Sequence, residues 1–160
     1  MKKLTFLLLL LPALSFAQLK KYGLATAGVH LISTDSKPGA ELTVGVMPKS
    51  TMGFGLSLDW IHDYGTPLLA DFRYVSKGNN GARLTVGPKL GYYFDNLTNI
   101  KGGFTVGGQA GLIIGRKTQS IIVSIQYLSL GYDKINPVNG NSIGKSSFND
   151  FSINAGFKFW

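Results

Sequence analysis

Apolar and polar residues alternate with a period of two along most of the chain beyond residue 22. The alternation is clearest in residues 40–47, 82–94 and 150–160, and no later stretch keeps the 3.6-residue period of an amphipathic helix. Because successive side chains of a strand point to opposite faces of a sheet, this pattern predicts an all-β protein. The eight predicted strands are Gly23–Thr34, Ala40–Met47, Met52–Asp63, Pro67–Ser76, Ala82–Phe94, Gly103–Gly115, Ser120–Tyr132 and Asp150–Trp160.

One face of these predicted strands is apolar, and the other carries mainly Gly, Thr, Ser and Asn. Only 15% of the chain is charged, whereas about a quarter is usual for a soluble domain. A polar face with so few charges is predicted to line a narrow interior in which opposite charges pair, while the apolar face points outward. The first predicted strand is compatible with either orientation. The predicted interior residues are Glu41, Asp59, Asp71, Arg73, Arg83, Lys89 and Lys158.

The aromatic residues fall at two heights if the strands run alternately up and down. Amphipathic rings at both edges of an aliphatic band are typical of barrels that span a bilayer, because such rings favour the headgroup depth. One predicted belt contains Trp60, Tyr64, Tyr92, Phe94, Phe104, Tyr132, Phe148 and Phe151. The other contains Tyr22, Phe54, Phe72, Tyr74, Phe157, Phe159 and Trp160. The pattern therefore predicts an eight-stranded antiparallel up-and-down transmembrane β-barrel, which has no free edge in the bilayer.

The N-terminus has the features of an export signal. Lys2 and Lys3 precede the apolar run Leu4–Leu14, and residues 15–17 provide a cleavage site. We predict a signal peptide at residues 1–17 and one outer-membrane β-barrel domain at residues 18–160. The apolar run is shorter than the about 20 residues that a membrane-spanning helix needs. Together, the export signal and the closed barrel predict the outer membrane of a Gram-negative bacterium.

The C-terminal segment is an alternating series that ends in aromatic residues: Phe151, Ile153, Ala155, Phe157 and Phe159, followed by Trp160. With this segment the chain resembles the small eight-stranded outer-membrane barrels of Gram-negative bacteria, such as outer-membrane protein X and the transmembrane domain of outer-membrane protein A. The resemblance is one of architecture and covers nearly the whole mature chain. It implies that the barrel-assembly machinery recognises this segment during insertion.

Few residues are candidates for chemistry. The chain has no Cys, and its only histidines are His30 and His62. We assign no catalytic, cofactor-binding or metal-binding residue, and we predict no cofactor and no enzymatic activity. One alternative is a lipid-modifying outer-membrane enzyme, a lipid A acyl hydrolase or transferase, that pairs His30 with Ser33 or His62 with a loop serine. A second alternative is a secreted soluble barrel that binds a small apolar ligand.

The predicted role is structural or in surface interaction, with outer-membrane lipids as partners. Eight strands enclose too little space for an open aqueous channel, so we predict no open pore. The long loop Asp133–Asn149 is the predicted surface for an extracellular ligand, because loops on a rigid scaffold commonly carry recognition. Nucleic-acid binding is not favoured: the net charge of +8 includes Lys2 and Lys3 of the predicted signal peptide, and the remaining positive charge is spread over turns. The candidate residues of the loop are Asp133, Lys134, Asn139, Asn141 and Lys145.

Overall fold

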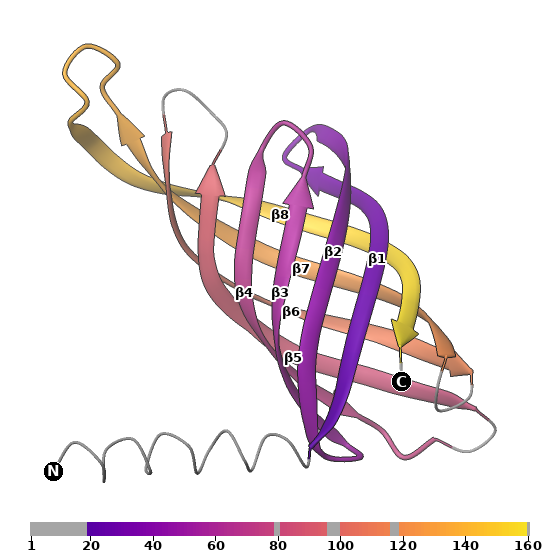
Figure 1. The fold of residues 1–160 in the computed structure, drawn as a ribbon. Helices are drawn as coiled ribbons and strands as arrows, with labels where there is room; N and C mark the ends of the chain where they lie inside the picture. The colour runs from indigo at the N-terminus through magenta and orange to yellow at the C-terminus, as the bar shows by residue number, and fades with distance from the viewer. Residues whose placement is uncertain (1–18, 79–80, 96–99, 116–118, 160) are drawn as a thin grey trace, which may run out of the picture.

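The computed structural model describes residues 19–78, 81–95, 100–115 and 119–159, which form one closed barrel of antiparallel strands (Figure 1). Each strand pairs with the next along the chain, and β8 pairs with β1 to close the barrel. Within the described ranges, no helix has the length and apolarity to cross a membrane. The predicted signal peptide, residues 1–17, lies outside them. The strands are β1 (Lys20–Ile32), β2 (Asp35–Lys49), β3 (Met52–Ile61), β4 (Gly65–Val75), β5 (Ala82–Asp95), β6 (Ile100–Gly115), β7 (Gln119–Ile135) and β8 (Ser142–Phe159).

Each predicted strand corresponds to one strand of the structure, and the all-β up-and-down barrel is confirmed. The largest difference concerns β8, which begins at Ser142 rather than at Asp150. The predicted loop Asp133–Asn149 is therefore wrong in extent, because β7 continues to Ile135 and only residues 136–141 connect the two strands. The extended part of this hairpin is mostly exposed to solvent. Because both faces of the hairpin are in contact with solvent, neither face has to be apolar. Its sequence therefore lacks the alternation of apolar and polar residues that identifies a half-buried strand.

The connections define two ends of the barrel. The upper end in Figure 1 carries the β1–β2, β3–β4 and β7–β8 connections, and the lower end carries the β2–β3 turn and the end of β8. Two upper turns are tight, and Ser33 (φ 56°) and Asp63 (φ 66°) adopt the left-handed conformation in them. A positive φ of this kind lets the chain reverse within a few residues. The upper turns therefore hold the strand ends close to one another.

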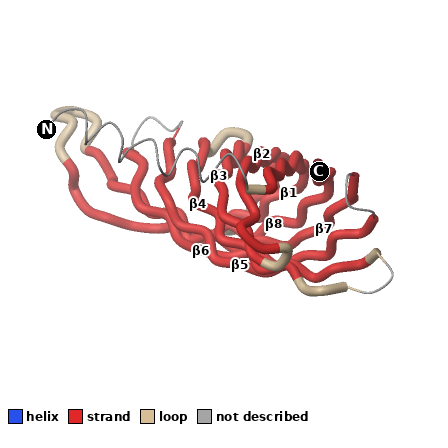
Figure 2. The backbone as a smooth tube through the Cα atoms, turned by 60° about the horizontal axis from the view of Figure 1, so that its bottom comes forward, coloured by secondary structure: helices blue, strands red, loops and turns tan. Residues whose placement is uncertain are grey.

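The wall of the barrel has an apolar outer face and a largely polar inner face. On β3, Leu56 is 56% exposed on the outside, whereas Ser57 is fully buried on the inside. On β1, Val29 and its alternate neighbours point outward, while His30 is fully buried. The first strand, for which the sequence left both orientations open, thus has a defined inner face. Figure 2 shows that strands make up the wall and that loops lie at its two ends.

The interior contains an apolar cluster near each end and a layer of polar side chains between them. We name these the upper cluster, the lower cluster and the polar layer. The core side chains of both clusters are buried, as expected for apolar groups that are excluded from water. The upper cluster consists of Ile32, Ile61, Leu69, Tyr93, Leu128 and Leu130. The lower cluster consists of Tyr22, Leu24, Val75, Ile113 and Ile122.

Four aromatic residues of the predicted belts lie inside the barrel or over its upper opening. Tyr22 is buried in the lower cluster, where Gly55 makes room for it: a Cβ atom at Gly55 would lie 2.9 Å from the Tyr22 hydroxyl. The ring centroid of Phe148 lies 5.4 Å from that of Tyr64 and 5.6 Å from that of Tyr132. Phe148 and Tyr64 pack on the upper cluster. The belt prediction is wrong for these four residues. An aromatic side chain is suited to the headgroup region of a bilayer, but it is equally suited to packing on the apolar side chains at an end of the barrel interior.

Candidate functional site

The lower part of the polar layer is centred on Asp71 of β4. Arg73 Nη2 donates a hydrogen bond of 2.6 Å to Asp71 Oδ2. Gln109 Nε2 lies 2.9 Å from both carboxylate oxygens, and Ser57 Oγ donates to Oδ2 at 3.3 Å. Asp71 thus has a cationic partner and a hydrogen bond on each oxygen. A buried carboxylate satisfied in this way is a stable structural element.

The middle part of the polar layer joins Glu41 of β2 to Lys89 of β5. The buried Lys89 ammonium donates to Glu41 Oε1 and to Gln126 Oε1, each at 2.5 Å. Thr43 Oγ1 donates to Glu41 Oε1 at 2.7 Å and lies 2.8 Å from Ser57 Oγ. The middle part is therefore also an acid paired with a base, and it is connected to the lower part through hydroxyl groups.

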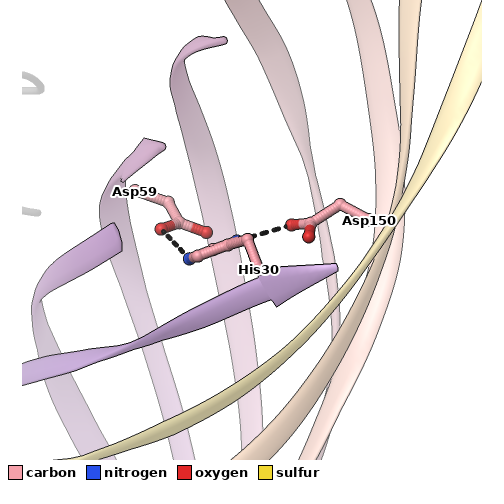
Figure 3. A group of neighbouring side chains, drawn as sticks. All are labelled: His30, Asp59 and Asp150. Atoms are coloured by element: carbon pink, nitrogen blue, oxygen red, sulfur yellow. Dashed lines mark hydrogen bonds and ion pairs between the residues drawn. The ribbon is translucent and has the colours of Figure 1, made fainter. Parts of the chain in front are cut away.

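The upper part of the polar layer is a histidine between two carboxylates (Figure 3). His30 Nδ1 of β1 lies 2.8 Å from Asp150 Oδ2 of β8, and His30 Nε2 lies 3.6 Å from Asp59 Oδ1 of β3. All three residues are fully buried. Gln126 Nε2 donates to Asp59 Oδ2 at 2.7 Å, which connects this group to the middle part. Among the described residues, His30 Nε2, Asp59 Oδ1 and Asp150 Oδ1 have no hydrogen-bond partner.

These three residues are also the group whose composition suits a cation. His30, Asp59 and Asp150 each offer one ligand atom, and these atoms lie within 4.8 Å of one another. An imidazole nitrogen with carboxylate oxygens is a common donor set for first-row transition metals. The sequence does not reveal the group, because its members are on three strands and His30 and Asp150 are 120 positions apart.

The predicted interior residues lie on the inner side of the wall. Arg83 is half-buried. Sequence reasoning missed Gln109, Gln126 and Asp150 as interior residues. The available signal was strand parity, because Asp150 shares its parity with the buried Ser152. The buried members of the predicted set are Glu41, Asp59, Asp71, Arg73, Lys89 and Lys158.

The predicted lipid-facing aromatic residues lie on the outer face of the wall. Some of them pack against one another: the ring centroids of Phe54 and Phe72 are 5.4 Å apart in an edge-to-face arrangement. Their contact with lipid headgroups stays a prediction. The exposed members are Trp60, Tyr92, Phe104, Phe151, Phe54, Phe72, Phe157 and Phe159.

The candidate residues of the predicted binding loop are divided between two strands and a turn. Asp133 and Lys134 lie near the end of β7, and Lys145 lies in β8, directly opposite Asp133. Asn139 and Asn141 lie in the turn at residues 136–141. The side chain of Asn139 accepts a hydrogen bond of 3.1 Å from the backbone N–H of Asn141. This part of the chain is therefore an extended β7–β8 hairpin with a hydrogen-bonded tip.

The β7–β8 hairpin also has an unpaired backbone edge. β1 pairs with β8 only from Gly23↔Phe159 to Ile32↔Asp150, whereas residues 142–149 pair with β7 alone in the described part of the chain. The N–H and C=O groups of such an edge are able to bind another strand. Val138 is 91% exposed at the tip, so the hairpin offers an apolar side chain as well.

The geometry does not assemble the histidine–serine pairs of the enzyme alternative. His30 is fully buried in the polar layer, while Ser33 lies in the exposed β1–β2 turn. His62 lies in the β3–β4 turn, where its ring centroid is 5.6 Å from that of Trp60 and its Nε2 is 3.3 Å from Asp63 Oδ1. Within the described residues, the recorded polar partners of the two histidines are aspartates rather than serines.

Two upper turns are tied together by an exposed ion pair. Lys37 Nζ donates a hydrogen bond of 2.8 Å to Asp63 Oδ2 in the β3–β4 turn. This hydrogen bond, with the neighbouring positive charges, holds the pKa of Asp63 below its usual range. Tyr64 donates to Asp35 at 3.1 Å and adds a second link between the same turns.

Comparisons with protein-family models and with curated protein sequences find no match for this chain. Among solved structures, the chain is similar to Neisserial surface protein A (NspA), with a TM-score of 0.62, 10% sequence identity, and coverage of 87% of this chain and 94% of that chain. It is also similar to the outer membrane protein OprG from Pseudomonas aeruginosa, with a TM-score of 0.59, 12% identity and coverage of 87% and 94%. These similarities show that the chain shares the barrel fold of outer-membrane proteins. The narrower resemblance to outer-membrane proteins X and A stays a prediction.

Proposed function

We propose that this chain is an integral β-barrel of the outer membrane of a Gram-negative bacterium, exported by its N-terminal signal peptide. The observation that carries the proposal is the inverted wall, with apolar side chains outside and charged side chains inside. Leu84 is 65% exposed on the outer face, whereas the adjacent Thr85 is buried. A barrel surrounded by water needs the opposite arrangement, and an apolar outer face of this extent is suited to lipid. The fold shared with outer-membrane proteins supports the same location.

The lower end faces the periplasm in this proposal. The exported N-terminus enters the barrel at the lower end, and the β2–β3 turn there comprises only residues 50–51, as is typical of periplasmic turns. The longer β7–β8 hairpin then lies outside the cell. Outer-membrane lipids surround the apolar face, and the barrel-assembly machinery recognises β8 during insertion.

We further propose that the barrel has no open pore and that its role is structural or in surface interaction. The proposal is supported by the apolar clusters near both ends and by the Asp71–Arg73 and Glu41–Lys89 ion pairs between them. The β7–β8 hairpin is the proposed interaction surface. Its open edge at residues 142–149 suits an extracellular partner that adds an extended segment as a strand. We propose no catalytic role, because His30 is sealed inside the barrel.

The first test is the electrophoretic mobility of the protein recovered from washed outer membranes of expressing cells, compared with and without heating in SDS. We expect the unheated protein to migrate differently from the heated one, because a closed barrel resists unfolding by SDS. Recovery from the soluble periplasm with a heat-independent mobility would contradict the proposal and would favour a soluble barrel.

The orientation and the closed interior are tested separately. A chain without Cys accepts single labels, so Val138→Cys in the hairpin tip and Ser50→Cys in the β2–β3 turn form a matched pair. On intact cells, a membrane-impermeant maleimide should label Val138→Cys and spare Ser50→Cys; the reverse result would invert the orientation. In planar bilayers, stable conductance steps of the size seen with porins would refute the closed interior.

A further inference from the structure

His30 and Asp59 face each other in the polar layer in a way that hydrogen bonding does not explain. The Nδ1 atom of His30 donates to Asp150 Oδ2 at 2.8 Å, which leaves a lone pair on Nε2 of the neutral imidazole. Nε2 lies 3.6 Å from Asp59 Oδ1, and both atoms are buried without a hydrogen-bond partner. A hydrogen bond spans about 2.7–3.2 Å, so the two atoms are too far apart to share one; at this distance a protonated His30 would form only an ion pair with Asp59. Two buried acceptors that face each other without a donor, here His30 Nε2 and Asp59 Oδ1, are suited to binding a cation between them.

We propose that the cluster of His30, Asp59 and Asp150 binds one divalent transition-metal ion, of the Zn²⁺ class, between His30 Nε2 and Asp59 Oδ1. The 3.6 Å separation of these two atoms fits such an ion. Zinc bonds to imidazole nitrogen and carboxylate oxygen are about 2.1 Å long, and two bonds of that length spanning the gap enclose an angle of about 120°, near the tetrahedral value. The imidazole ligand favours zinc, iron, nickel or copper over magnesium and calcium.

Asp150 orients the ring that binds the ion. A metal-bound histidine commonly donates its second N–H to a carboxylate, which fixes the tautomer and increases the basicity of the ligand nitrogen. The hydrogen bond from His30 Nδ1 to Asp150 Oδ2 has this arrangement. Asp150 Oδ1 is a further buried atom of this cluster without a hydrogen-bond partner. The cluster therefore has more hydrogen-bond acceptors than the donors around it satisfy.

The surrounding charges also favour a dication over a proton. Among the described side chains of the middle and upper parts, the carboxylates of Glu41, Asp59 and Asp150 stand against the single ammonium of Lys89. Protonation of His30 alone would leave a net negative charge buried in a medium of low dielectric constant. A divalent ion beside a neutral imidazole makes the group neutral. The inference thus departs from the sequence-based expectation of no metal site.

The side chains packed above His30, Asp59 and Asp150 restrict how a metal ion reaches them. The upper cluster and the aromatic side chains packed on it lie above His30, and all three cluster residues are fully buried. We therefore expect the ion to enter while the strands close rather than through the finished barrel. Loading must accompany refolding in any test.

The test is metal retention by the full chain, unfolded in urea with EDTA and refolded in detergent micelles with ZnCl₂, MnCl₂ or MgCl₂. Free ions are removed on a chelating resin, and bound metal is measured by plasma mass spectrometry. We expect about one zinc ion per chain, no retained magnesium, and a higher thermal unfolding midpoint for the zinc-loaded barrel. Refolded wild-type protein without retained transition metal would overturn the proposal.

Asp59→Asn and His62→Ala are the matched variants. Asp59→Asn keeps the size of the side chain but removes the anionic ligand, and it should lower zinc retention at least tenfold. His62→Ala removes the exposed histidine beside Asp63 and should leave retention unchanged. Loss of zinc in His62→Ala, or equal retention in Asp59→Asn, would assign the ion to the surface and refute the buried site.

A spectroscopic measurement on the wild-type protein keeps the proposal testable if Asp59→Asn does not fold, as judged by its mobility on unheated SDS gels. X-ray absorption at the zinc edge should show a first shell of nitrogen and oxygen with the outer-shell scattering of one imidazole. A shell of oxygen atoms alone would exclude His30 as a ligand and overturn the proposal.

Discussion

The lower and middle parts of the polar layer differ from the upper part in charge balance. Asp71 is paired with Arg73, and Glu41 is paired with Lys89. In the upper part, two carboxylates flank one imidazole, and His30 Nε2, Asp59 Oδ1 and Asp150 Oδ1 have no hydrogen-bond partner. A buried charge without a counter-charge of its own is costly, so the pairing of the charges matters more than their number. Asp71 and Glu41 each have a cation of their own within the protein, whereas Asp59 and Asp150 share one imidazole, and the proposed metal ion would supply the charge that is missing there.

The largest expected effect comes from breaking a completed pair. Lys89→Met leaves the buried Glu41 without its ammonium partner and should lower the free energy of unfolding by about 3–5 kcal/mol. The measurement is urea unfolding in lipid vesicles, followed by tryptophan fluorescence. The double variant Lys89→Met/Glu41→Leu is the control and should recover most of the loss. An unchanged stability of the single variant would show that the Glu41–Lys89 pair contributes nothing.

The second-largest loss of stability is expected from a charge placed on the outer face of the wall, because no counter-charge is available there. Leu56→Arg should cost about 2–4 kcal/mol of stability in a bilayer, measured by the same urea titration. Thr85→Val is the matched change on the inner face. It should be nearly neutral, since the buried Thr85 hydroxyl has no partner to lose. If Leu56→Arg were harmless in an inserted barrel, the assignment of inner and outer faces would be wrong.

Neutralising one carboxylate of the middle part and one of the upper part should change the stability in opposite directions. In metal-free protein, Glu41→Gln should destabilise the barrel by about 1.5–3 kcal/mol, because it weakens a charge-assisted bond to Lys89. Asp59→Asn should instead stabilise it by about 1 kcal/mol, because it removes a buried carboxylate charge that has no cation of its own. Both changes in the free energy of unfolding are to be measured by urea titration in the presence of EDTA. Equal losses in the two variants would remove the difference between the two parts.

The smallest effect belongs to the exposed Lys37–Asp63 pair, where water screens the charges. The folded state lowers the pKa of Asp63, so this carboxyl stabilises the fold fully above its unfolded pKa of about 3.9. The contribution is lost as the pH falls through the lower folded pKa. A thermal unfolding series from pH 6 to pH 2 should therefore differ slightly between wild type and Asp63→Asn, with the gap closing at acid pH. A gap that widens on acidification would contradict the lowered pKa.

The sequence predicted the elements that face two different environments. The alternation in β3 and β8 identified both strands and the inner position of Asp59, because each wall residue is either buried inside or exposed outside. The hairpin residues 142–149 escaped prediction, since they have no such contrast. Tyr22 was misplaced because an aromatic side chain suits either a belt or a sealed barrel end.

The candidate site was predictable only in part. Strand parity gives an inner face to Asp59, and the presence of His30 is evident, but no local pattern brings them together. Closure of the barrel sets the register between strands, and this register places Asp150 beside His30 across the closing β1–β8 seam. The sequence alone thus determined the all-β barrel and its two faces, because a period of two is a local property. Only the tertiary structure decided which charges pair and which remain unmatched, because that depends on side chains from distant strands meeting in a buried interior where each charge needs a neighbour.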